Sequence, residues 1–284
     1  MTATYTVILF YTFVPIADPR ALSLSQRALC ESLGLKGRLL IASEGVNGTF
    51  EGTPDSIAAY QAALRADVRF SGIVFKESES NGEAFRKLEV RVRPEVVTLG
   101  AGEFDVKKET APEVTAEELD AFFAKDEDFV ILDLRNDHEI EAGRFEKTAN
   151  PGLKNFRDLP KKISQLQHLK KKKVVAVCTG GIRCEKATCL LKKEGFENLY
   201  QLKDGIHTYI QKFPGRHFKG TLFVFDNRMV TPVIEMANRE IIARCFDCGS
   251  ACENYFSDDR VRPSQKVICC ADCIEKHAEL RSCA

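Results

Sequence analysis

The chain has 284 residues, and its 41 lysines and arginines are balanced by 41 aspartates and glutamates. This length accommodates two or three modest domains, and the balanced charge means that any nucleic-acid binding must depend on a local basic patch. No stretch is long and apolar enough to span a membrane, and residues 2–5 lack the charged start of a signal peptide, so the sequence predicts a cytoplasmic protein.

The first hundred residues alternate between predicted strands and helices. Strands are expected over 5–13, 37–42, 48–51, 72–76 and 88–93, with helices over 19–33 and from 54 to about 65. Asp18 and Thr53 are placed to cap the two helices. The order β-α-β-β-α-β, with one extra strand, is that of a ferredoxin-like split βαβ domain, which we assign to residues 1–99.

Two polar groups in this first domain have a functional and a structural interpretation. Glu44 and Asn47 are either catalytic or part of a polar hairpin connection over 44–48. The basic residues of the last strand either bind an RNA backbone or form a solvated strand face; they are Arg86, Lys87, Arg91 and Arg93. For both groups the pattern favours the structural interpretation.

Residues 100–123 form a predicted linker and a lead-in helix that begins with a capping box at Thr115. The central domain, residues 124–218, has apolar runs over 129–135 and 199–202 that alternate with helical segments. Strands that alternate with helices indicate a parallel sheet, so the fold class is α/β here and α+β in the first domain.

One loop of the central domain carries a chemical pattern. The apolar strand Val174–Val177 is followed by Cys178, and a helix begins near Glu185. A loop that leads into a helix N-terminus directs backbone N–H groups at one point and favours negative charge there. Arg183 adds positive charge, so the pattern predicts a reactive thiolate. The residues between Cys178 and Arg183 are Thr179, Gly180, Gly181 and Ile182. The alternative is a buried, inert cysteine before an ordinary turn.

The last region, residues 219–284, is rich in cysteine and contains two C-x2-C pairs separated by 21 residues. This spacing is typical of a tetrahedral zinc site with the ligands Cys245, Cys248, Cys270 and Cys273. Competing ligands are Cys252, Cys269, Cys283 and His277. The same cysteines could instead be free thiols, or a redox relay to Cys178.

The loop from Cys178 to Arg183 resembles the active-site loop of rhodanese domains, and the string CTGGIRCEKA resembles the bacterial tRNA uridine(34) hydroxylase family. The segments 42–48 and 223–229 also resemble that family, so the resemblance covers nearly the whole chain. It implies an acylphosphatase-type first domain and a central rhodanese domain in which Cys178 acts as a thiolate or persulfide, assisted by Arg183. Asp133 and Arg135 match a strand end that supports the loop in rhodaneses.

The resemblance implies oxygen-dependent hydroxylation of uridine 34 in tRNA to 5-hydroxyuridine. Molecular oxygen is then the co-substrate and tRNA the partner; no catalytic cofactor, obligate protein partner or membrane is evident. One alternative is a persulfide sulfurtransferase, and another is a non-catalytic RNA-binding adaptor. A phosphatase is disfavoured, because related phosphatases place five residues between cysteine and arginine where this chain has four. Cys184 is either a resolving thiol or simply a residue of the helix start.

Overall fold

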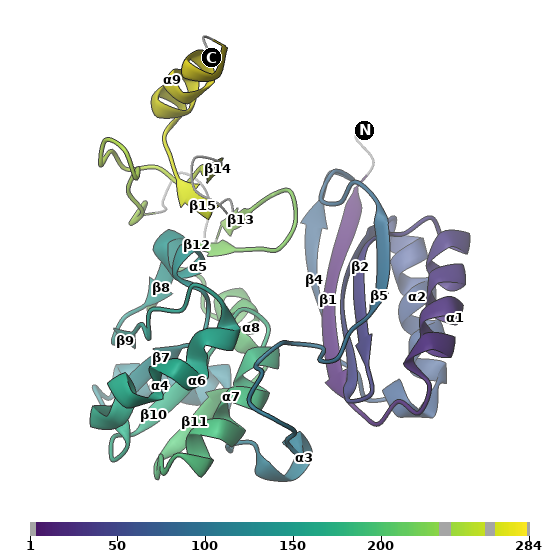
Figure 1. Ribbon diagram of the computed structural model, residues 1–284, viewed down its shortest axis with the longest axis horizontal. Helices are drawn as coiled ribbons and strands as arrows, with labels where there is room; N and C mark the ends of the chain where they lie inside the picture. Colours follow the sequence, from purple (N-terminus) through teal and green to yellow (C-terminus); the bar gives the residue numbers. More distant parts are fainter. Residues whose placement is uncertain (1–3, 233–239, 259–264, 283–284) are drawn as a thin grey trace. The chain divides into compact units, whose positions relative to one another are not determined.

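The computed structural model describes residues 4–232, 240–258 and 265–282. The chain forms two compact units: Met1–Thr110 with Asp226–Arg228, and Ala111–Phe225 with Met229–Ala284 (Figure 1). The finer division at residues 99, 123 and 218 stays a prediction. None of the helices in the described ranges has the length and apolar character needed to cross a membrane.

The first unit has the predicted strand and helix order. Its sheet has the strand order β4-β1-β3-β2-β5, in which β1 and β2 each pair antiparallel with β3. The fifth strand runs parallel to β2 at the sheet edge. Together these features confirm the ferredoxin-like fold. The elements are β1 (Tyr5–Phe13), α1 (Pro19–Ser32), β2 (Lys36–Ala42), β3 (Gly45–Gly52), α2 (Pro54–Ala66), β4 (Phe75–Ser80), β5 (Leu88–Val92) and α3 (Val106–Glu109).

The predicted caps set the helix starts in this unit. The Asp18 side chain accepts a hydrogen bond from Ala21 N, and the Thr53 side chain accepts one from Ser56 N. Each capping residue is followed by a proline, whose missing N–H needs no partner at that position. Both helices lie on one side of the sheet (Figure 1), and their apolar residues join those of the strands in one core cluster.

Two strand boundaries differ from the prediction. The third strand begins at Gly45 rather than Gly48, so most of the expected connection belongs to a hairpin. Pairing on both sides overrides the low strand propensity of its glycines and asparagine. The strand expected over 72–76 is β4, Phe75–Ser80. It is an edge strand, where the charged and polar sequence after Phe75 is tolerated and conceals the strand pattern.

Glu44 and Asn47 have a structural role in this unit. A carboxylate oxygen of Glu44 accepts a hydrogen bond from Val96 N at 2.8 Å. The side-chain amide of Asn47 donates one to Val96 O at 2.9 Å. The pair thus satisfies both backbone groups of a buried residue, which supports the polar hairpin interpretation.

The second unit is built around a five-stranded sheet with the order β6-β11-β10-β7-β9, and every pairing in it is parallel. The predicted parallel sheet is therefore confirmed. Its elements are β6 (Glu113–Val114), α4 (Ala116–Ala124), β7 (Val130–Asp133), α5 (Asp137–Ala142), β8 (Gly143–Phe145), β9 (Thr148–Ala149), α6 (Leu159–Lys162), β10 (Val174–Val177), α7 (Ile182–Lys193), β11 (Leu199–Leu202) and α8 (Gly205–Lys212).

The central strand β10 is buried on both faces, since none of its four residues is exposed. Val175 and Val177 share a core cluster with side chains of α4 and α8. A strand covered on both faces reads as a continuous apolar run, which is why β10 was predictable. The capping box at Thr115 is also present, with Glu118 as its partner.

The C-terminal part of this unit is attached to the parallel sheet domain by an antiparallel strand. This strand, β12 (Phe218–Phe223), pairs with β8 and with β13 (Val230–Pro232). A separate hairpin of β14 (Tyr255–Asp258) and β15 (Gln265–Ile268) follows, then α9 (Ala271–Ser282). We did not predict this hairpin or α9, because their sequence was interpreted only through its cysteines.

Candidate active site and cysteine cluster

Cys178 directly follows β10, at the carboxyl end of the parallel sheet. The last residue of β10, Val177, is paired with Asp133, the last residue of β7. Open α/β sheets place their ligands outside this edge. The Cys178 side chain is completely buried, and α7 begins four residues later at Ile182. The structure thus places the cysteine between a strand end and a helix N-terminus, as the sequence predicted.

The loop curls around the Cys178 sulfur. Gly181 donates its backbone N–H to Sγ at 3.2 Å, and its φ of 103° is one that glycine adopts readily. Burial raises the pKa of Cys178, but a side-chain hydrogen bond from Cys184, the charge of Arg183 and backbone N–H groups together lower it to about 5. The thiol therefore ionises well below neutral pH.

Arg183 is held by a carboxylate that the sequence analysis did not identify. Its Nη1 and Nη2 atoms contact the two Glu139 oxygens at 2.7 and 2.8 Å, and Nη2 lies 3.3 Å from Thr179 Oγ1. Burial lowers the pKa of Arg183, but Glu139 raises it more, so the guanidinium stays charged. Glu139 is in α5, and only its capping-box spacing from Asn136 marked it in the sequence.

Asp133 and Arg135 bind each other beside the loop and are completely buried. The Asp133 carboxylate also accepts the backbone N–H of Arg135 at 3.1 Å, so it caps the turn at the end of β7. Arg135 donates to the carbonyls of Glu139 and Gly143. The pair therefore fixes the ends of β7 and α5, and through α5 the position of Glu139.

The start of α8 holds the loop from the other side. Ile206 N donates to Cys178 O at 2.9 Å, and His207 N donates to Thr179 O at 3.0 Å. Gly205 lies against the loop backbone: a Cβ atom there would be 2.7 Å from Cys178 O and from the Gly180 carbonyl carbon. Only glycine permits this approach, and its φ is +72°. No feature of the sequence indicated this contact.

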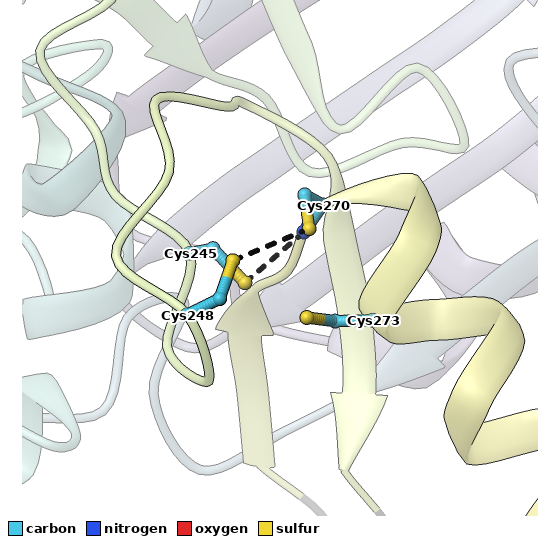
Figure 2. A group of neighbouring side chains, drawn as sticks. All are labelled: Cys245, Cys248, Cys270 and Cys273. Atoms are coloured by element: carbon cyan, nitrogen blue, oxygen red, sulfur yellow. Dashed lines mark hydrogen bonds between the residues drawn. The ribbon is translucent and has the colours of Figure 1, made fainter.

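The four predicted metal ligands gather at one point of the second unit (Figure 2). The four sulfur atoms all lie within 4.8 Å of one another; they belong to Cys245, Cys248, Cys270 and Cys273. Cys248 Sγ is 3.6 Å from Cys270 Sγ, and Cys270 N donates to Cys245 Sγ at 3.3 Å. Zn–S bonds of about 2.3 Å place thiolates roughly 3.8 Å apart in a tetrahedron, so the spacing fits zinc.

A second donor set overlaps the first. Cys245 and Cys273 also lie with Asp247 and Cys269 within 4.8 Å. Asp247 Oδ2 contacts His277 Nε2 at 2.8 Å and the Cys269 sulfur at 3.3 Å. Gly249, directly after Cys248, has a φ of +75° and donates its N–H to Cys245 O at 2.9 Å, so the chain turns there.

The fold and the loop define a rhodanese-type domain joined to an acylphosphatase-type domain. Comparison with known families agrees. Residues 5–96 match the UPF0176 acylphosphatase like domain, residues 115–212 the rhodanese-like domain, and residues 219–284 the rhodanase C-terminal family. A rhodanese-like domain from Anabaena is a similar solved structure, at 24% identity and a TM-score of 0.33; the match covers 38% of this chain and 79% of that one.

Curated relatives match over nearly the whole length. The tRNA uridine(34) hydroxylase of Cytophaga hutchinsonii is 40% identical over 272 residues, covering 96% of this chain and 86% of the relative. The protein of the same name from Shouchella clausii is 39% identical over 292 residues, covering 100% and 88%. The chain belongs to the tRNA uridine(34) hydroxylase family.

Proposed function

We infer that this protein is an oxidoreductase that hydroxylates uridine 34 of tRNA to 5-hydroxyuridine, with molecular oxygen as co-substrate. The observation that carries this inference is the similarity, at 39–40% identity over almost the full chain, to relatives named for that activity. The buried cysteine with an acidic pKa supplies the reactive group that such an enzyme needs.

Cys178 is the proposed catalytic residue, acting as a thiolate or as a persulfide formed from it. The loop N–H groups and Arg183 stabilise the negative sulfur, in the same way as preorganised donors stabilise an oxyanion. Arg183 is positioned by Glu139 and Thr179. Asp133 and Arg135 do not contact the sulfur in this proposal; they act indirectly, because they hold the segment that carries Glu139.

The partner that we propose for this reaction is tRNA, and we propose a cytoplasmic location with it. In the first unit, Glu89 gathers three basic side chains: Lys87 Nζ at 2.9 Å, Arg91 at 3.0 Å and Arg38 at 3.7 Å. These three cations surround one carboxylate, which leaves a local excess of positive charge on β2 and β5. Such an excess attracts phosphates in a chain whose net charge is zero.

The cysteine cluster is proposed to hold a structural zinc ion through Cys245, Cys248, Cys270 and Cys273. Four thiolates close the coordination shell and leave no open position, which is typical of structural rather than catalytic zinc. The expected metal content is one zinc per chain, measured by inductively coupled plasma mass spectrometry. Cys248→Ser should lower this content, and Cys30→Ser, which alters a buried cysteine of the first unit, should leave it unchanged.

The function is tested by mass spectrometry of tRNA nucleosides from cells that lack this gene. We expect loss of 5-hydroxyuridine and its derivatives, with restoration by the wild-type gene and not by Cys178→Ser. Cys189→Ser is the matched control, because Cys189 is equally buried but lies further along α7. Unchanged 5-hydroxyuridine with loss of a thiolated nucleoside would instead identify a sulfurtransferase.

A further inference from the structure

An exposed phenylalanine, Phe225, contacts the active-site arginine. All 19 phenylalanines of the chain lie in the described ranges, and only Phe225 and Phe246 among them are exposed. The exposed fraction of Phe225 is 53%. A single exposed apolar side chain is ordinary on a protein surface, so the surroundings of this ring determine whether it has a task.

The Phe225 ring borders the Cys178 loop through Arg183. The guanidinium lies over the ring, with 5.6 Å between its carbon Cζ and the ring centroid, which is a cation–π distance. The same guanidinium binds Glu139 and contacts Thr179 Oγ1 in the loop. Arg183 itself is buried. The ring therefore covers the arginine of the active-site loop and also presents an aromatic surface to solvent.

A cluster of aromatic side chains holds the Phe225 ring in place. Phe223, at the end of β12, meets it at a centroid distance of 5.2 Å and an interplanar angle of 83°. Phe223 is buried, and its ring also packs against His138 of α5 and Tyr255 of β14. Because the exposed ring rests on buried neighbours, little side-chain freedom would be lost when a ligand binds to it.

A cation lies at the same cluster. Lys266 is exposed on β15, and its Nζ atom is 5.5 Å from the centroid of the Phe223 ring. Since Phe223 contacts both Phe225 and Lys266, an open aromatic surface and an ammonium group are neighbours. Single-stranded nucleic acids are bound by this combination, in which bases stack on aromatic rings and cations contact the phosphates.

On the basis of the proposed function, we propose that Phe225 stacks against a base of the tRNA anticodon loop and that Lys266 binds a neighbouring phosphate. Phe225 is then a positioning residue, because the stacked base is held next to Arg183 and the Cys178 loop. The anticodon loop is single-stranded, so its bases are free to turn out and stack on a protein ring. Every base has an aromatic face, so the contact holds the loop without selecting its sequence.

Two substitutions separate stacking from simple coverage of Arg183. Phe225→Leu keeps an apolar side chain at this position but has no aromatic face, whereas Phe225→Tyr keeps the face. In filter binding with tRNA from cells that lack this gene, Phe225→Leu should bind at least about fivefold more weakly than wild type. Phe225→Tyr should stay within about twofold of wild type. Equal affinities of wild type and Phe225→Leu would overturn the stacking role.

The RNA side of the contact is tested with two anticodon stem-loop RNAs. One is intact, and the other lacks the bases at position 34 and at its two neighbours but keeps every phosphate. Phe225→Leu should weaken binding of the intact RNA and leave binding of the abasic RNA unchanged, because the stacking partner is already missing there. The same loss of affinity for both RNAs would show that the ring acts on the protein and not on a base.

The phosphate contact is tested by its salt dependence. Lys266→Gln should lower the slope of log affinity against log salt by about 0.7, because one contact to a single-stranded phosphate is lost. Phe225→Leu should weaken binding without changing this slope, since stacking releases no counterions. A slope that Lys266→Gln leaves unchanged would reject the phosphate contact.

Phe246→Ala is the matched control, because it removes the other exposed phenylalanine. Its tRNA affinity should equal that of wild type, and a loss as large as that of Phe225→Leu would overturn the assignment of stacking to Phe225. Failure of the proposed function is a separate result. A wild-type gene that does not restore 5-hydroxyuridine to the tRNA of cells lacking it would reject the hydroxylase itself, whatever the binding data.

Discussion

The ionisation of Cys178 is the most direct test of the loop geometry. The ordinary thiol pKa of 9.0 is lowered to about 5, because hydrogen bonds from Cys184 and the loop N–H groups, together with Arg183, outweigh the effect of burial. At pH 7 the thiolate fraction is then about 99%, compared with about 1% for an unshifted thiol. The structure therefore provides roughly a 100-fold larger population of the nucleophile at neutral pH.

The assay is the pH dependence of thiolate ultraviolet absorbance, taken as the difference between wild type and Cys178→Ser. We expect a single step near pH 5, and hydroxylation that falls with acidification through the same pH. Because the folded-state pKa is the lower one, the contribution of Cys178 to stability rises between about pH 5 and 9 and is lost below that range. Cys184→Ala should move the step upward, since it removes one hydrogen bond to the thiolate. A step above pH 8 in the wild type would refute the reasoning.

Three further substitutions probe separate parts of the chain. Gly205→Ala forces a Cβ atom to 2.7 Å from Cys178 O, so it should lower the free energy of unfolding by about 1–3 kcal/mol and reduce hydroxylation. Glu139→Gln leaves the buried Arg183 charge uncompensated and should destabilise the protein by roughly 3–5 kcal/mol in denaturant unfolding. Arg91→Ala should weaken tRNA binding and lower the slope of log affinity against log salt by about one, measured by filter binding.

For the first two substitutions, the control is the same amino-acid exchange at a position with different contacts. Gly195→Ala also has a positive φ, but its nearest neighbour is the end of Lys170 at 3.7 Å; equal effects at both glycines would exclude the clash. Glu127→Gln breaks the partly exposed pair with Lys173 and should cost less than about 1 kcal/mol. A salt slope unchanged by Arg91→Ala would remove this residue from the tRNA interface.

The sequence predicted the parts of the site that are local in the chain. Cys178, the glycine turn and the start of α7 are consecutive, and their spacing alone determines that N–H groups converge on the sulfur. Glu139 is 44 residues from Arg183 in the chain, and no periodicity or spacing links the two. The contact of Gly205 with the loop is equally non-local. Only tertiary packing brings these residues to the cysteine.

The same distinction applies to the fold. The strand β10, which is covered on both faces, was predicted at its observed limits because burial imposes an apolar run. The edge strand β4 was misplaced by three residues at its start, since an edge position permits the polar sequence after Phe75. In the cysteine-rich region, α9 starts between the third and fourth predicted ligands. The C-x2-C spacing predicts metal ligands but not helices, so α9 was not predicted.

The bonding of Arg183 determines how the thiolate is stabilised. Both of its Nη atoms contact Glu139, whose negative charge offsets much of the field that the guanidinium exerts on Cys178. Consistent with this, the hydrogen bond from Cys184 lowers the Cys178 pKa more than the charge of Arg183 does. The loop is thus a set of directed hydrogen-bond donors supported by an arginine–glutamate pair, and not a cup closed by a free cation. Such an arrangement keeps the sulfur ionised without binding a second anion tightly, which leaves the thiolate available to react.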